Sequence, residues 1–201
     1  MFAYIKGVFE EKGNNYVVID VGGIGYKIFM SNMAMAGLGE TGNIVKVHTY
    51  YYVREDNISL YGFSTKEELK MFELLISVSG VGAKSAISML SAISPSDFAM
   101  AIISDDVTSL KKVPGVGAKT AQRIILELKD KLKNDEIAES SNEEVTTTFV
   151  SKTNESDEAI AALQILGYSK KDIEKVLSEL DLSEKTTQDI IKEGLKYLSN
   201  N

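Results

Sequence analysis

The sequence predicts an α+β chain of several small domains: a five-stranded β-barrel, a helical domain with two glycine turns, a flexible linker and a three-helix bundle. Apolar residues recur with a period of two in residues 1–63, which favours strands. They recur with helical spacing in residues 64–134 and 156–201. Residues 135–155 are acidic and rich in Ser, Thr and Asn, which predicts a disordered linker.

The first segment is expected to form a closed barrel of the OB type. Five runs rich in Val, Ile, Tyr and Phe are separated by turn residues, and they span residues 2–9, 15–21, 25–30, 44–53 and 58–62. Short strands with glycine breaks suit such a barrel, although a small sandwich fits almost as well. The segment Gly22-Gly23-Ile24-Gly25 superficially resembles a dinucleotide-binding loop, but it leads into a strand, which favours a β turn.

The second segment contains helix start signals. Thr65-Lys66-Glu67-Glu68 is a capping box, in which a hydroxyl and a carboxylate accept hydrogen bonds from first-turn amides. Ser94 followed by Pro95 begins another helix, because serine caps it and proline at the first position needs no amide partner. The last helix carries an apolar face formed by Ala121, Ile124, Ile125, Leu128 and Leu132.

The C-terminal segment predicts three short helices. Gly167 ends the first, Ser169 caps the second, and the third extends from about Glu184 to Leu198.

The distribution of charge separates the segments. The net charge of −7 argues against a nucleic-acid partner only when it is averaged over the chain. Residues 1–63 and 64–134 carry net charges of −1 and +2, whereas residues 135–155 and 156–201 carry −5 and −3. The acid is therefore concentrated in the C-terminal third, and the central segment is mildly basic.

The residue types present exclude several kinds of site. The sequence has no cysteine, which excludes disulfides, thiolate zinc sites and iron–sulfur clusters. The single histidine, His48, cannot build a histidine-based metal site and is expected to be an ordinary strand side chain. No apolar run approaches the roughly 20 residues of a membrane span, and the N-terminus does not resemble a signal peptide. We therefore expect no metal, no cofactor, no membrane partner and a cytoplasmic location.

The strongest signal is an internal repeat in the central segment. Ser79-Gly80-Val81-Gly82-Ala83-Lys84-Ser85-Ala86 returns 35 residues later as Pro114-Gly115-Val116-Gly117-Ala118-Lys119-Thr120-Ala121. Each copy follows an apolar helical stretch and precedes a helix. One copy alone would suit a tight turn between helices. Two copies that both end in Ala-Lys-Ser/Thr-Ala favour a ligand.

The chemistry of this turn favours phosphate. Glycine lets the backbone approach a ligand closely, and the following helix begins with unpaired amides and a positive dipole end. Lys84 and Lys119 add positive charge, and Ser85 and Thr120 add hydroxyl donors. None of these groups needs to touch a base edge, so binding should be independent of sequence. A Walker loop is excluded because its lysine follows the glycine directly, whereas here an alanine intervenes.

The tandem turns resemble the helix-hairpin-helix motif, and the order of the segments is similar to that of the RuvA family of Holliday junction proteins. The barrel carries Val53-Arg54-Glu55-Asp56 and then Leu60-Tyr61-Gly62-Phe63. The last segment carries Glu158-Ala159-Ile160-Ala161-Ala162-Leu163 and then Leu166-Gly167-Tyr168. The resemblance covers the whole chain except the linker.

The resemblance implies a non-catalytic DNA-binding scaffold. Proteins of this family form four-fold symmetric homotetramers that hold a four-way junction open and recruit the hexameric ATPase RuvB for branch migration in recombination and repair. Whether one or two tetramers bind each junction stays open. The implied phosphate-contacting residues are Gly80, Gly82, Lys84, Ser85, Gly115, Gly117, Lys119 and Thr120. Arg123, one helical turn after Lys119, is a further candidate, although it suits a solvated helix face equally well.

Two other sets of residues are implied by the resemblance. Glu55 and Asp56 would form an acidic pin, although the residues alone also suit a β-hairpin turn. Leu163, Leu166 and Tyr168 would form the motor-binding surface, although their spacing also suits the core of a small bundle.

Two other function classes are alternatives. A helix-hairpin-helix DNA glycosylase or lyase would use Lys119 as its nucleophile, but it needs a catalytic aspartate on a folded element downstream, where this chain has an acidic linker. A single-strand binder would stack bases on Tyr50, Tyr51 and Tyr52. Consecutive strand residues alternate between faces, so we expect these tyrosines to be divided between core and surface.

Overall fold

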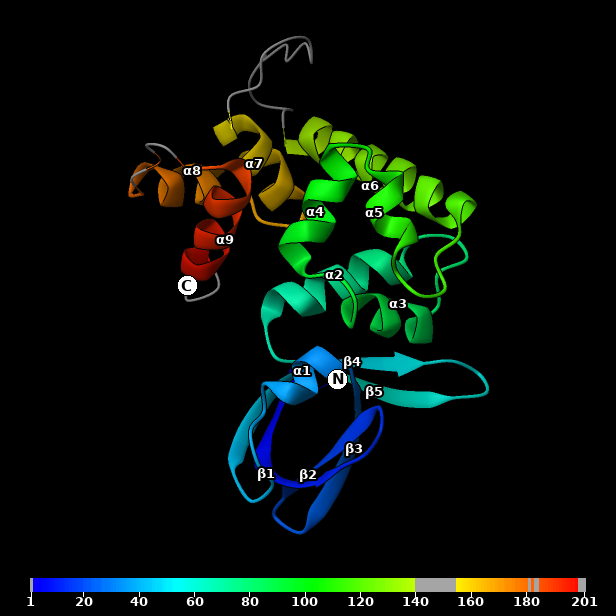
Figure 1. The fold of residues 1–201 in the computed structure, drawn as a ribbon. Helices are drawn as coiled ribbons and strands as arrows, with labels where there is room; N and C mark the ends of the chain where they lie inside the picture. Colours follow the sequence, from blue (N-terminus) through cyan, green and yellow to red (C-terminus); the bar gives the residue numbers. More distant parts are fainter. Residues whose placement is uncertain (1, 140–154, 181, 183–184, 199–201) are drawn as a thin grey trace. The chain divides into compact units, whose positions relative to one another are not determined.

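The computed structural model describes residues 2–139, 155–180, 182 and 185–198. The chain divides into two compact units. The first comprises residues 1–76 and 82–94, and the second comprises residues 77–81 and 95–201. Figure 1 shows the elements of both.

The first unit contains a closed β-barrel whose strands are joined in the order β1-β2-β3-β5-β4 (Figure 1). The strands are β1 (Tyr4–Lys12), β2 (Tyr16–Val21), β3 (Ile24–Met30), β4 (Ile44–Val53) and β5 (Ile58–Phe63). Neighbouring strands are antiparallel, except that β3 and β5 pair in parallel. The expected five-stranded barrel is confirmed, and the sandwich is wrong because the sheet closes on itself.

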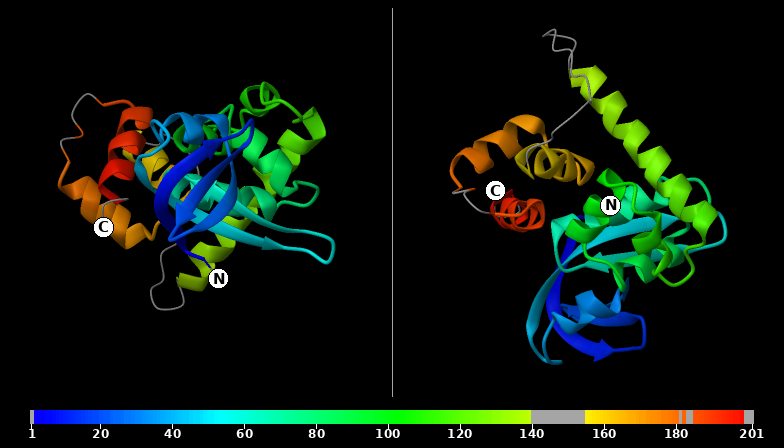
Figure 2. Two further views of the ribbon diagram at one scale, coloured as in Figure 1. Left: turned by 90° about the horizontal axis from the view of Figure 1, so that it is seen from below. Right: turned by 45° about the horizontal axis from the view of Figure 1, so that its top comes forward.

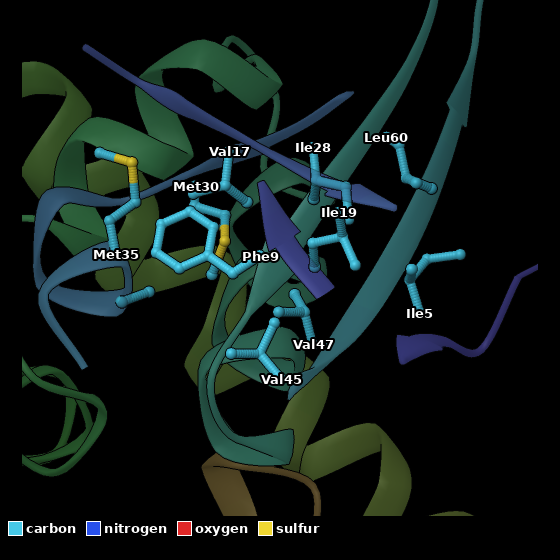
Figure 3. Close-up of a cluster of buried hydrophobic side chains, with 11 residues drawn as sticks. Ile5, Phe9, Val17, Ile19, Ile28, Met30, Met35, Val45, Val47 and Leu60 are labelled. Carbon is cyan, nitrogen blue, oxygen red and sulfur yellow. The ribbon is translucent and has the colours of Figure 1, made fainter. Parts of the chain in front are cut away.

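Alternate strand residues fill the interior of the barrel. Phe9, Ile19, Ile28 and Val47 have no exposed surface and belong to one apolar cluster (Figure 3). The short helix α1 (Asn32–Ala36), which the sequence analysis did not anticipate, adds Ala34 and Met35 to this cluster. Ser31 begins that helix, because its hydroxyl accepts a hydrogen bond from the Ala34 amide at 3.1 Å.

The glycines at residues 22 and 23 form the turn between β2 and β3. Their φ angles are 65° and 89°, and Val21 pairs with Ile24 across the turn. Two consecutive positive φ angles are typical of a tight β-hairpin, which confirms the β turn and excludes a dinucleotide-binding loop.

Two helices complete the first unit, α2 (Lys66–Ile76) and α3 (Ala83–Leu90). The expected capping box is present: the Thr65 hydroxyl accepts from the Glu68 amide at 3.2 Å, and the Glu68 carboxylate accepts from the Ser64 amide at 2.8 Å. Burial raises the pKa of the Glu68 carboxyl, although hydrogen bonds that the carboxylate accepts from the backbone of Ser64 and Thr65 oppose the shift. Helix α2 contacts β4 and β5, and the Phe72 ring lies 5.3 Å from the Tyr50 ring.

The second unit is helical. Its elements are α4 (Pro95–Ile103), α5 (Val107–Lys111), α6 (Ala118–Glu139), α7 (Glu155–Ile165), α8 (Lys170–Ser178) and α9 (Thr187–Leu198). Ala121, Ile124 and Leu128 on the apolar face of α6 are buried, as the periodicity predicts. No single helix in the described ranges is long and apolar enough to cross a membrane, whereas the bent pair α3 and α4 could do so by length and composition alone.

The boundary expected at Asp135 needs correction. Helix α6 continues to Glu139, because Glu and Ala in this stretch favour helix even though the segment is acidic (Figure 2). The rest of the expected linker, residues 140–154, lies outside the described residues.

The C-terminal helices begin and end close to the predicted positions. Gly167 has φ +80° after α7, and the Ser169 hydroxyl accepts from the Asp172 amide at 3.2 Å to cap α8. Helix α9 begins at Thr187, three residues later than expected, and Thr186 accepts from the Asp189 amide. Helix α7 contacts α8 and α9, and also α4.

Candidate nucleic-acid interface

The two glycine turns have the same backbone conformation. In the first, the Val81 amide donates to the Val78 carbonyl at 3.1 Å, and in the second the Val116 amide donates to the Val113 carbonyl at 3.1 Å. The third residue of each turn is a glycine, with φ +84° at Gly80 and +83° at Gly115. A positive φ at this position indicates a type II turn. The repeat in the sequence is therefore also a repeat in conformation.

A helix begins in the same way after each turn. The Ala86 amide donates to the Gly82 carbonyl, and the Ala121 amide donates to the Gly117 carbonyl, both at 2.9 Å. Gly82 is extended and its position has no side-chain cap. The first amides of α3 are therefore not covered by a capping side chain, and they can attract an anion.

The valine between the two glycines of each turn is buried, whereas the polar side chains face solvent. Val81 and Val116 are 6% and 7% exposed and anchor the turns. Lys84, Ser85 and Lys119 are exposed, and Thr120 is half-buried. Each turn thus presents the lysine and hydroxyl that the sequence analysis assigned to phosphate.

The second glycine of each turn is not required by the protein itself. A Cβ atom added at Gly82 or Gly117 would meet no atom within 4 Å, and neither residue has a positive φ. The first glycines differ, because their positive φ angles strain any other residue. The space beside Gly82 and Gly117 is open, as close approach of a ligand would require.

We predict that Gly82→Ala combined with Gly117→Ala leaves folding intact but weakens DNA binding by roughly tenfold. The added methyl groups occupy open space in the free protein, but they would stand between the backbone and an approaching phosphate. Thermal unfolding and a DNA titration measure the two effects. The comparison variant, Gly80→Ala with Gly115→Ala, should lower stability by about 1 kcal/mol or more at each site. Wild-type affinity in the first variant would contradict close backbone contact.

Arg123 contacts the first turn. Its Nη1 donates to the Ser79 carbonyl at 3.2 Å, and its side chain remains 55% exposed. Arg123 therefore lies on an exposed helix face but also contacts the protein backbone. Its contact with a phosphate remains a prediction.

Glu55 and Asp56 lie at the exposed tip of the hairpin formed by β4 and β5. The loop is closed by a hydrogen bond from the Arg54 amide to the Asn57 carbonyl at 2.8 Å. Arg54 also donates through Nε to the Tyr52 hydroxyl at 2.8 Å. This hairpin extends past the other strands of the barrel (Figure 2). The β-hairpin turn is present, and its two carboxylate side chains are exposed.

A groove of about 500 Å³ in the first unit connects two of the predicted sites. Lys84 of the first turn and Asn57 of the acidic hairpin both line it, together with Lys27 from β3. The fold of the first unit therefore places Lys84, near the start of α3, along the same groove as Asn57 of the hairpin that carries the acidic pair.

The three consecutive tyrosines are divided between faces, as expected. The rings of Tyr50 and Tyr52 pack against Phe72 and Tyr61, respectively, whereas Tyr51 is 37% exposed and lies against Phe2. They do not form a shared stacking platform. His48 is a strand residue of β4, and its pKa is lowered, chiefly by burial.

The three residues assigned to motor binding differ in how deeply they are buried in the C-terminal bundle. Leu163 and Leu166 have no exposed surface, which confirms that they are core residues of this chain. Tyr168 is half-buried, and its amide donates to the Leu163 carbonyl at 3.2 Å. Their role toward a motor remains a prediction.

Two residues that the sequence did not indicate contact the first turn or the residue before it. Glu127 accepts a hydrogen bond from the Ser79 amide, and Lys131 donates one to the Ser77 hydroxyl. Both follow Arg123 at intervals of four, so helical spacing placed them on one face, but nothing in the sequence indicated what this face contacts.

Comparison with known proteins gives matches along most of the chain. Residues 1–62 match the family model described as RuvA N terminal domain, residues 72–130 match SAM-like Helix-hairpin-helix tandem, and residues 154–199 match RuvA, C-terminal domain.

Several curated relatives are named Holliday junction branch migration complex subunit RuvA. The protein of Acetivibrio thermocellus is 51% identical over 99% of both chains. That of Ruminiclostridium cellulolyticum is 46% identical over 98% of this chain and 100% of its own. That of Clostridium tetani is 44% identical over 98% of this chain and 99% of its own. With this identity over nearly the whole chain and the same order of domains, the chain belongs to the RuvA family.

Proposed function

We propose that this chain binds four-way DNA junctions through their phosphate backbone and serves as a non-catalytic subunit of a branch migration complex. The observation that carries the proposal is the pair of glycine turns with matching conformation, each presenting an exposed lysine. The names of the full-length relatives support the junction as the target. The DNA-binding subunit would act beside a hexameric ATPase, RuvB, in the cytoplasm.

The residues proposed to contact phosphate act through three kinds of group. The glycines allow close approach, the lysines supply charge, and the hydroxyls supply hydrogen bonds. They are Gly80, Gly82, Lys84, Ser85, Gly115, Gly117, Lys119 and Thr120, with Arg123 at the edge of the first turn. The DNA glycosylase or lyase and the single-strand binder are not favoured, because the relatives are named as branch migration subunits and the tyrosines do not form a platform.

A gel shift tests the proposal directly. The purified chain is titrated against a four-way junction and against a linear duplex of equal length, at the same salt concentration. Each DNA is prepared in two unrelated sequences. We expect the chain to bind the junction more tightly than the duplex, and the affinity to stay the same when the DNA sequence is changed. Equal affinity for both DNAs would overturn the proposal, and cleavage of an abasic duplex would favour the lyase.

The assembly is expected to be a symmetric homotetramer. A four-way junction has four near-equivalent arms, and a four-fold ring would offer each arm an identical pair of turns. Light scattering on the full chain should therefore give four copies. A monomer at micromolar concentration that still binds junctions tightly would refute this prediction. One or two tetramers per junction would then be distinguished by the mass of the complex.

The C-terminal bundle is proposed to bind the motor. Residues 156–201 carry a net charge of −3, which disfavours contact with DNA, and they contain no repeat of the glycine turn. A chain ending at Glu139, where α6 ends, should retain junction binding but lose stimulation of RuvB-driven branch migration. Circular dichroism and a melting curve check its fold, because removing α7 uncovers part of α4.

Tyr168→Ala should reproduce part of this loss, since Tyr168 is half-buried. Leu163→Ala and Leu166→Ala should instead act by destabilising the bundle, by about 2–5 kcal/mol each, because both leucines are fully buried. Loss of junction binding in the shortened chain would refute the division of roles.

A further inference from the structure

One face of α6 holds the first glycine turn by its backbone. Arg123 Nη1 donates to the Ser79 carbonyl at 3.2 Å, and the Ser79 amide donates to Glu127 Oε2 at 3.1 Å. Arg123 and Glu127 also form an ion pair at 3.9 Å. Lys131, one turn further along, donates to the Ser77 hydroxyl. Both backbone groups of Ser79 therefore have a partner on the same helix.

This helix belongs to the other copy of the repeat. Helix α6 follows the second glycine turn, whereas Ser79 belongs to the first, and residues 77–81 lie in the same compact unit as α6. Residues four apart lie on one face of a helix, which places positions 123, 127 and 131 in line. The second hairpin thus supports the turn of the first.

The two copies differ at the position that this helix holds. Ser79 in the first turn corresponds to Pro114 in the second, and each is the second residue of its type II turn. Proline is favoured there because its ring locks φ near −65°, and it has no amide hydrogen to donate. Serine lacks that restraint, but it has an amide, and Glu127 accepts from it.

We propose that Glu127, together with Arg123, is a positioning residue that fixes the first turn for phosphate binding, as the ring of Pro114 fixes the second. The proposal rests on the proposed function, because it explains how both turns are held in a phosphate-binding conformation before DNA binds. A turn that is already held in its binding conformation loses less conformational entropy when the ligand binds. Glu127 would contribute to affinity without touching DNA.

The sign of the effect separates this role from simple electrostatics. Glu127 is negatively charged and lies beside a turn that would bind phosphate, and its side chain is 32% exposed. If its charge were what mattered, removing it would tighten DNA binding. If its hydrogen bond to Ser79 is what matters, removing it weakens binding despite the loss of negative charge.

The test compares Glu127→Ala with Glu127→Gln in the full chain, titrated against a four-way junction at several salt concentrations. Both variants lose the same charge, but glutamine keeps an oxygen that can accept from the Ser79 amide. Glu127→Ala should bind about three- to tenfold more weakly, the effect of losing one hydrogen bond. Its log–log salt slope should be unchanged, because no phosphate contact is lost. Glu127→Gln should bind as tightly as wild type or slightly more tightly.

A second substitution provides the rescue. Ser79→Pro introduces the restraint of the second turn, so adding it to Glu127→Ala should restore wild-type affinity. Hydrogen exchange in the DNA-free protein should become faster in residues 77–82 of Glu127→Ala, and should stay unchanged in residues 113–117. Equal or tighter binding by Glu127→Ala, or no rescue by Ser79→Pro, would overturn the proposal. If the wild-type chain fails to bind junctions, the proposed function fails instead, and hydrogen exchange still tests the support of the turn.

Discussion

Replacing Lys84 and Lys119 together by alanine is expected to weaken junction binding at least about 100-fold, because we propose that each lysine makes a charged contact to phosphate. The loss should be similar for junctions of unrelated sequence, since phosphate contacts carry no sequence information. Both lysines are exposed, so the fold should not change. The log–log salt slope should also become flatter, by about 0.9 for each phosphate contact removed.

A matched control removes the same charge elsewhere. Lys170 and Lys171 on α8 are exposed, and Lys170→Ala with Lys171→Ala changes the net charge by the same amount. This control should retain wild-type affinity and slope. If the slope of the first variant were unchanged, the two lysines would not be the phosphate contacts, whatever happened to the affinity.

Neutralising the two acidic residues of the β4–β5 hairpin is expected to raise DNA affinity, in contrast to the loss expected for the lysine variant. Glu55→Gln with Asp56→Asn should raise the affinity for linear duplex, on the order of tenfold at low salt, because two carboxylates that repel phosphate are removed. The preference for junctions over duplex should narrow. The loop itself should persist, since a backbone hydrogen bond between Arg54 and Asn57 closes it. Parallel titrations of junction and duplex measure both effects.

The physical reason lies in the expected symmetry. In a four-fold ring, each subunit would bring one pair of carboxylates to the centre of the junction, where they would repel the crossing strands and disfavour continuous duplex. The pair would then provide specificity and would cost affinity. Glu10→Gln with Glu40→Gln removes two exposed charges from the same barrel and should leave the preference unchanged. If neutralising Glu55 and Asp56 weakened junction binding at low salt, repulsion could not be their main role.

Local sequence patterns were sufficient for most elements of the fold. The five strands follow from period-two alternation, and the capping box at Thr65 and Glu68 forms as written. Such signals act within a few residues, so they can be read without knowing the rest of the chain. The error at Asp135 has the same origin, because acidic composition suggested a linker while the intrinsic helix propensity of Glu and Ala favoured a longer α6.

The parts of the candidate site that depend only on local backbone conformation could be predicted from the sequence. The Gly-Val-Gly repeat specified two turns of the same type, and the matching φ angles at Gly80 and Gly115 follow from residues within each turn. The burial of Leu163 and Leu166 was not decided by their spacing, because an apolar residue on a helix can serve a core or a partner. Packing of the bundle decided it in favour of the core.

The sequence by itself determined the order of the segments, the five strands, and the repeated turns with their lysines, because these depend on residue patterns within short stretches of the chain. Closure of the strands into a barrel rather than a sandwich depended on pairing between distant residues, such as Tyr4 with His48. Only the tertiary structure decided what surrounds those turns. It brought Glu127 to the backbone of Ser79, 48 residues away, and it placed Lys84 and Asn57 along one groove. Such contacts depend on how distant elements pack, and neither hydrophobic periodicity nor a local motif encodes which side chains packing will bring together.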